Sequence, residues 1–190
     1  MQGKHLKDGM YLVIKVIINM YEGNNKHKDS FEIGLEFQDF IIRKLLHNYG
    51  IVIQPYSSKK YQFEVGESLQ GYEIKYDARS TGDCTHGYCE ATNNVAIEVY
   101  EKTNKNNDTW TPSGILRKDN TIYYVIGNYD MCWIIDKMVL IRFYRQNIYK
   151  VVETLSTIKT MLIPINIMDE YAIQAIVFND NYGKQAKLDL

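Results

Sequence analysis

The stretch GYEIKYDARSTG, residues 71–82, decides how this sequence is interpreted. It has the composition of a buried strand, yet it places Glu73, Lys75 and Asp77 at every second position. In an extended strand, successive side chains alternate between two faces, so these three charged side chains are expected on one face. A strand face that carries acid, base and acid in turn indicates a functional site rather than simple packing.

A helix is expected before this strand. Asp29 or Ser30 is predicted to cap it, and the helix should run to about Asn48 and end at Gly50. Its polar side is interpreted mainly as a solvated face, with Glu36 as the one candidate site acid on the helix. The predicted apolar stripe consists of Ile33, Phe37, Phe40, Ile41 and Leu45.

Short segments rich in β-branched and aromatic residues follow this helix. Strands are predicted at 51–56, 60–65, 72–77, 95–101 and 121–128, and a return to helix at 146–159. A helix followed by a run of strands predicts an α/β or α+β fold with one sheet. The 190 residues, of which 45% are hydrophobic, suit a single domain that covers 1–190.

Charge and cysteine content narrow the function classes. A formal net charge of -1 excludes a globally basic nucleic-acid coat protein but leaves a local basic face open. Three cysteines do not make a disulfide framework, so reduced thiols and a cytoplasmic location are expected, with Cys132 in the core. The apolar segment 11–21 is interrupted by Lys15, is too short to cross a bilayer and is interpreted as a packing helix, so neither secretion nor a membrane partner is expected.

The segment VGESLQGYEIK, residues 65–75, carries the candidate chemistry. Glu67 precedes the strand, and Glu73 and Lys75 lie within it. Two carboxylates can bind a hard divalent cation such as Mg²⁺ or Mn²⁺, while a lysine on the same face steadies the attacking water or the phosphate charge. The alternative is a cross-strand ion pair on a wet face, which is common for Glu-x-Lys in sheets.

The pattern resembles the PD-(D/E)XK nuclease superfamily, whose motif is an acid, a variable gap, then Asp or Glu, any residue, and Lys. GYEIKYDARSTG, NVAIEVYEK and WTPSGILRKDNTIYYVIGN are similar to a phage and bacterial branch of it, over about residues 66–128. Glu67 stands where Asp is usual. The resemblance implies a restriction-endonuclease-like core, a central mixed β-sheet flanked by helices. It also implies metal-binding and catalytic roles for Glu67, Glu73 and Lys75.

Further residues are candidates for the same site or for its substrate. Asp77 and Glu98 are possible second-site carboxylates, since Glu98 interrupts an apolar run where an unpaired charge is costly. Basic residues after the Pro-Ser-Gly-Ile turn and between 137 and 150 are predicted to contact phosphates, with a solvated strand edge as the alternative. These basic candidates are Arg117, Lys118, Arg142 and Arg145.

The segment CTHGYC, residues 84–89, is a separate candidate. Cys84, His86 and Cys89 are ligand types that zinc prefers, but a structural zinc site needs four ligands, which leaves an incidental loop as the alternative. A Cys-His hydrolase is less well supported, because no orienting third group is evident.

The leading hypothesis is a Mg²⁺-dependent endonuclease acting on nucleic acid, with DNA the expected form, in a phage or defence setting. A nuclease-like fold that binds nucleic acid or a protein without cutting, or a zinc-stabilised binding module, is the alternative. The sequence leaves open whether two chains pair as a homodimer to cut both strands.

Overall fold

The fold was analysed in a computed structural model, which describes residues 30–84 and 87–178. The chain divides into two units, Met1–Ile33 and Gly34–Leu190. Each is treated by itself, and the contacts given below lie within the second unit. The packing helix expected at 11–21 lies outside the described residues.

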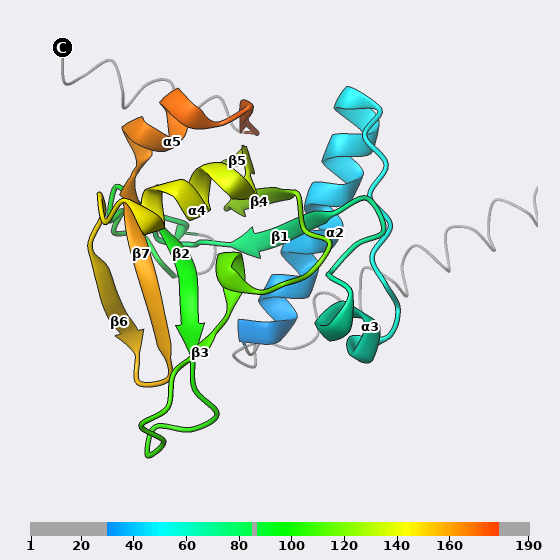
Figure 1. The fold of residues 1–190 in the computed structure, drawn as a ribbon. Helices are drawn as coiled ribbons and strands as arrows, with labels where there is room; N and C mark the ends of the chain where they lie inside the picture. The colour runs from blue at the N-terminus through cyan, green and yellow to red at the C-terminus, as the bar shows by residue number, and fades with distance from the viewer. Residues whose placement is uncertain (1–29, 85–86, 179–190) are drawn as a thin grey trace, which may run out of the picture. The chain divides into compact units, whose positions relative to one another are not determined.

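Two helices precede the strands, and two further helices lie between later strands of the described chain (Figure 1). The elements are α2 Ser30–Tyr49, α3 Lys59–Glu64, β1 Tyr72–Tyr76, β2 Asn94–Glu101, β3 Thr111–Pro112, the 3-10 turn η2 Gly114–Leu116, β4 Tyr123–Gly127, β5 Met131–Asp136, α4 Lys137–Arg145, β6 Val151–Leu155, β7 Ile158–Pro164, α5 Ile165–Tyr171 and β8 Gln174–Val177.

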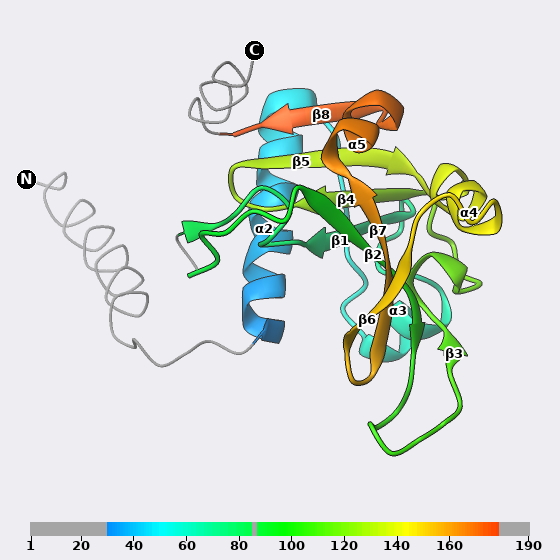
Figure 2. The same ribbon diagram turned by 90° about the vertical axis from the view of Figure 1, so that its left-hand side faces the viewer.

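The strands form two four-stranded sheets within the described residues (Figure 2). The first has the order β1-β4-β5-β8, with β1 parallel to β4 and the other pairs antiparallel. The second has the order β3-β2-β7-β6 and is antiparallel throughout. The mixed α/β class is confirmed, but the expectation of one sheet is wrong.

The physical reason for two sheets lies at the edge of β2 that faces away from β7. Side-chain and turn contacts cover part of this edge: the Asp77 carboxylate accepts a hydrogen bond from the Ala96 N–H, and the Ser113 N–H donates to the Val99 carbonyl. Gly114 lies against the Glu98 backbone at the same edge. Only the two-residue β3 pairs with β2 here, so the first sheet does not continue into the second.

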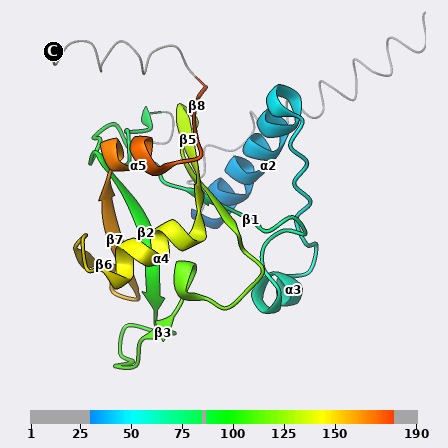
Figure 3. The ribbon, with the colours of Figure 1, turned by 45° about the horizontal axis from the view of Figure 1, so that its top comes forward.

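Two hydrophobic cores cover the two faces of the first sheet. Figure 3 shows the elements that enclose them, with α2 on one side of the first sheet and the second sheet on the other. One lies between this sheet and α2, and contains Phe37, Ile41 and Leu45 of the helix. The other lies between the two sheets, where α4, α5 and η2 also contribute side chains. Its largest fully buried side chain is Trp133, which donates from Nε1 to Asp169 Oδ1 at 2.6 Å.

The prediction for α2 is confirmed in position and, for four of the five stripe residues, in its buried face, whereas Ile33 is only partly buried. Phe37, Ile41 and Leu45 are fully buried, and Phe40 packs against them with part of its surface exposed. Gly50 follows the last turn with a φ of 67°, a left-handed conformation that glycine adopts without steric cost. Its N–H donates to the Leu46 carbonyl and so closes the helix.

Three secondary-structure predictions are wrong. Residues 51–56 form no strand, although Pro55 bridges to Ser68. Residues 60–65 are largely helical, in α3, where Tyr61 and Phe63 remain exposed because this short helix buries little of its surface. Residues 146–159 are not helical: their β-branched residues pair as β6 with β7.

Across residues 30–84 and 87–178, none of the helices combines the length and the apolar character that crossing a membrane requires.

Candidate active site

Strand alternation in β1 sends its charged residues toward the core between the sheets. Ile74 faces α2, because it belongs to the core on that side. Glu73 pairs in register with Tyr124, which belongs to the core between the sheets. Neighbours in register share a face, so Glu73 and Lys75 lie on the face opposite to α2. The predicted common face of these two residues is therefore confirmed.

Glu67, Glu73 and Lys75 meet at one point. Lys75 Nζ lies 2.8 Å from Glu67 Oε1 and 2.9 Å from Glu73 Oε1. Glu73 is buried, with 1% of its side chain exposed, whereas 41% of the Lys75 side chain is exposed. Glu67, Glu73 and Lys75 are called the trio below. Its buried end is Glu73, and its solvent-exposed end is Lys75.

A second set of charges supports Glu73 from inside the protein. Arg117 Nη2 lies 3.8 Å from Glu73 Oε2, and Arg117 Nε donates to Asp119 Oδ2 at 2.6 Å. Lys137, the first residue of α4, donates to Asp119 Oδ1 at 2.7 Å and to the Arg117 carbonyl at 2.8 Å. Positive and negative groups therefore alternate from Lys137 through to Glu67.

The protonation states follow from these contacts. Burial lowers the pKa of Lys75, but the charges of Glu73 and Glu67 outweigh it, so the pKa lies above its ordinary value and Lys75 stays protonated. Burial raises the pKa of Asp119, but the hydrogen bonds from Lys137 and Arg117 outweigh it and hold the pKa below 3.8. Burial, together with the Glu73 charge, raises the pKa of Tyr124.

Asp77 follows β1 and does not join the trio by any contact in the described structure. Its Oδ1 accepts from the N–H groups of Arg79 and Ser80 at 3.2 Å, and its Oδ2 accepts from the Ala96 N–H at 2.8 Å. Burial raises the pKa of Asp77 above 3.8, while these backbone hydrogen bonds act in the opposite direction. In this structure, Asp77 shapes the turn after β1 and anchors it to β2.

Glu98 and Glu36 lie on other elements. Glu98 Oε1 accepts from Ser113 Oγ at 2.6 Å, which joins β2 to the turn before η2. Glu36 lies on α2. Burial of Tyr129 raises the pKa of its hydroxyl to about 12, and the nearby charge of Glu36 adds to this rise. Within the described residues, neither glutamate is brought into contact with Glu67 or Glu73. A metal-binding role for Asp77, Glu98 or Glu36 stays a prediction.

The predicted phosphate-binding residues fall into two groups. Arg117 is half-buried inside the site and Lys118 is exposed beside it. Arg142 and Arg145 are exposed in the last turn of α4, where positive charge also favours the helix dipole. With Met138, Val139 and Ile141 they line an open hollow of about 410 Å³.

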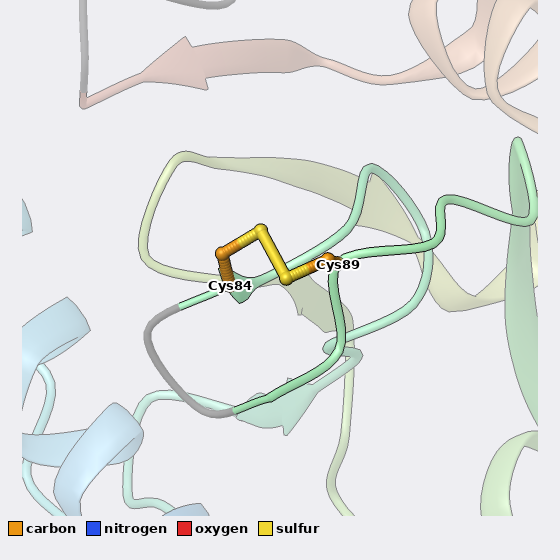
Figure 4. Close-up of a disulfide and its surroundings, with 2 residues drawn as sticks. All are labelled: Cys84 and Cys89. Carbon is orange, nitrogen blue, oxygen red and sulfur yellow. A yellow bond between two sulfur atoms is a disulfide. The ribbon is translucent and has the colours of Figure 1, made fainter.

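The cysteine loop differs from the expectation. Cys84 and Cys89 are joined by a disulfide (Figure 4), so the expectation of reduced thiols is wrong for these two residues. The backbone explains their approach, because Asp83 and Tyr88 exchange two hydrogen bonds and bring the two ends of the loop together. His86 lies outside the described residues. Zinc binding here would require the disulfide to be reduced, and it stays a prediction.

Cys132 is fully buried in β5 and free, as the apolar run around it predicted. Burial raises the pKa of its thiol to about 12, so at neutral pH it is an inert core residue.

The side chains near β1 determine which ligands a metal ion would find there. Within residues 30–84 and 87–178, no three His, Cys, Asp or Glu side chains gather closely enough to hold an ion. Glu67 and Glu73 do converge as a pair. Mg²⁺ is commonly bound by one or two carboxylates together with water and substrate phosphates, so this pair fits such an ion.

Sequence reasoning missed Asp119, Thr121 and Tyr124, and it assigned Lys137 to phosphate contact rather than to the ion pair with Asp119. Thr121 Oγ1 donates to Glu73 Oε2 at 3.3 Å, and Asp119 ties Arg117 to Lys137. One signal was available: Lys137 stands in the apolar run MCWIIDKMVL, where a charged residue needs a partner.

Comparison with protein-family models, with curated proteins and with solved structures found no match.

Proposed function

We propose that this chain is a Mg²⁺-dependent nuclease with a restriction-endonuclease-like core, which hydrolyses phosphodiester bonds of nucleic acid at Glu67, Glu73 and Lys75. The observation that carries the proposal is the convergence of two carboxylates on one lysine at the end of β1. The order acid, acid, lysine of the superfamily motif is matched by Glu67, Glu73 and Lys75. These same three side chains contact one another in the fold. DNA is the expected substrate.

The roles of the three residues follow from their protonation and burial. Glu67 and Glu73 would hold the ion, and the ion, when bound, would stabilise charge on the phosphate and the departing oxygen. Lys75 is held protonated by the two carboxylates, so it would act as a hydrogen-bond donor to the attacking water or the phosphate rather than as a general base. Arg117 and Thr121 would hold Glu73 in place from the buried side.

A second candidate is a nuclease-like fold that binds nucleic acid or a protein partner without cutting. The observation that favours it is that the charges of the site already satisfy one another: Lys75 bridges both carboxylates, and Arg117 and Lys137 share Asp119. Such a network is also found as a structural device in proteins without catalysis. The two candidates differ in metal binding and in turnover.

The test combines calorimetric titration of Mg²⁺ and Mn²⁺ with cleavage assays on single-stranded, duplex and branched nucleic acid, each repeated in EDTA. Lys75→Met should reduce cleavage by about 100-fold or more and still bind metal, because both carboxylates remain. Glu73→Gln should lose metal binding and cleavage. Glu64→Gln, on exposed α3, is the matched control and should behave as the parent.

Full cleavage activity in Glu73→Gln would refute the assignment of the site. A parent protein that binds nucleic acid but neither metal ion would favour the second candidate.

A further inference from the structure

Three strand ends meet at one tryptophan. Trp110 directly precedes β3, Lys102 directly follows β2, and Lys159 is the second residue of β7. In the order β3-β2-β7, the strand β2 separates Trp110 from Lys159, so the indole spans β2. Lys159 Nζ lies 4.2 Å and Lys102 Nζ 4.6 Å from the centre of the indole ring. In Figure 1 this is the end of the second sheet from which the β2–β3 connection extends.

The arrangement gathers two positive charges at one aromatic ring. Glu153 lies opposite Lys159 in the β6–β7 ladder, and Glu101 precedes Lys102. Within the described part of the chain, neither glutamate forms an ion pair with either lysine. Two ammonium groups held at one ring repel each other, and an anion placed between them would relieve that repulsion. The indole holds both lysines in position through cation–π contacts.

We propose that Lys102, Trp110 and Lys159 form a phosphate clamp that grips the backbone of duplex DNA beside the candidate active site. This inference rests on the proposed function, and it names a contact for the same substrate. The three side chains are partly exposed on open strand ends, which suits a long polyanion better than an enclosed small anion. Because lysines bind phosphates as point charges, the clamp positions DNA without reading its sequence.

The chain connection places the clamp within reach of the same duplex. From Trp110 the chain passes through β3 and η2 to Arg117, which contacts Glu73. The chain between Trp110 and Arg117 advances by seven residues, so these two residues lie at most roughly 25 Å apart. One turn of B-DNA is about 34 Å long, so one duplex can contact the clamp and the trio within a single turn.

The test measures binding of a fluorescently labelled duplex in EDTA, where metal-dependent cleavage does not occur, between about 50 and about 200 mM salt. For Lys102→Gln/Lys159→Gln, the slope of log K against log salt should shrink by about 0.9 for each lysine that contacts a phosphate. Lys102→Arg/Lys159→Arg keeps the charges and should keep the slope. Trp110→Leu should weaken binding with the slope unchanged, because it frees the lysines without removing their charge.

Lys44→Gln is the matched control, because Lys44 is also a partly exposed lysine in a cation–π contact, 5.5 Å from the centre of the Phe40 ring on α2. Its slope should equal that of the parent. Equal slopes for the parent and the double glutamine variant, or an equal drop in Lys44→Gln, would overturn the clamp.

The outcomes separate the two proposals. A parent that binds duplex through the clamp but cleaves none of the single-stranded, duplex and branched substrates with Mg²⁺ or Mn²⁺ contradicts the nuclease and supports the clamp. A parent that cleaves duplex, with an unchanged slope in the double glutamine variant, contradicts only the clamp. A parent that does not bind duplex contradicts the clamp.

Discussion

Arg117 and Glu73 approach each other inside the protein, with 3.8 Å between Nη2 and Oε2. Only 1% of the Glu73 side chain and 24% of the Arg117 side chain are exposed. Arg117 Nη2 is buried and has no hydrogen-bond partner in the described structure, while its Nε is held by Asp119. Asp119 therefore aims a fixed positive charge at the buried acid of the trio.

Removal of this charge should destabilise the fold. Arg117→Gln leaves Glu73 buried with Lys75 as its remaining cation, and breaking a buried pair in this way costs about 3–5 kcal/mol. Urea unfolding at neutral pH measures the change in the free energy of unfolding. Lys60→Gln is the control, since it breaks the exposed pair with Glu64 and should change stability by less than about 1 kcal/mol. Equal effects of the two substitutions would show that Arg117 does not support Glu73.

Asp119 should make stability depend on pH on the acid side. The pKa of Asp119 in the folded protein lies below its ordinary value of 3.8. The ionised carboxylate therefore stabilises the folded state, and its full contribution is present when the pH is above 3.8. This contribution is lost as the pH falls through the folded pKa. Asp119→Asn should therefore be less stable than the parent by about 1.5–3 kcal/mol at neutral pH, because it weakens hydrogen bonds to two charged groups.

The difference between parent and Asp119→Asn should narrow as the pH falls below 3.8, since the parent then also carries a neutral side chain. Urea unfolding over a pH series measures it. A difference that stays constant down to the acid limit of the folded state would contradict the role given to Asp119.

Gly114 should tolerate no side chain. Its φ is 48°, and a Cβ atom at this position would collide with the backbone carbonyl of Glu98. Gly114→Ala should therefore cost about 2 kcal/mol or more, from left-handed strain and overpacking together. Gly34→Ala provides the contrast: it lies inside α2 with nothing within 4 Å of the added Cβ, and should gain about 0.5–1 kcal/mol. Thermal unfolding should show a lower melting temperature for Gly114→Ala and a higher one for Gly34→Ala. An unchanged melting temperature in Gly114→Ala would refute the close approach of Gly114 to the Glu98 backbone.

The Cys84–Cys89 disulfide should contribute to stability through the short loop that it closes. The chain-entropy relation gives about 2 kcal/mol for a loop of this length. Reductant should lower the free energy of unfolding of the parent by about this amount, and should leave Cys84→Ser/Cys89→Ser unchanged. The reduced parent also tests the zinc hypothesis: chelator should lower its melting temperature if zinc is bound, and elemental analysis should detect the metal. A parent insensitive to reductant would contradict a stabilising disulfide.

The sequence by itself determined the local elements with strong patterns. The apolar stripe of α2 and its end at Gly50, the strand alternation of β1 and the buried Cys132 all depend on spacing within one short segment. For the same reason, the shared face of Glu73 and Lys75 was predictable from their separation by two residues. Where a segment carries β-branched residues at mixed spacing, as in 146–159, the local pattern did not distinguish helix from strand, and pairing with β7 decided it.

Only the tertiary structure decided which charges meet. Asp77 has the same two-residue spacing from Lys75 as Glu73 has, yet the strand ends at Tyr76. The turn that follows directs the Asp77 carboxylate to N–H groups of the turn itself and to the Ala96 N–H of β2. Asp119 and Lys137 lie far from Glu73 in the chain, and they reach it through Arg117 because β4, η2 and the start of α4 pack around one buried point. Such contacts depend on the packing of distant segments, because a buried charge is stable only where the fold supplies an opposite charge, and no spacing along the chain specifies that partner.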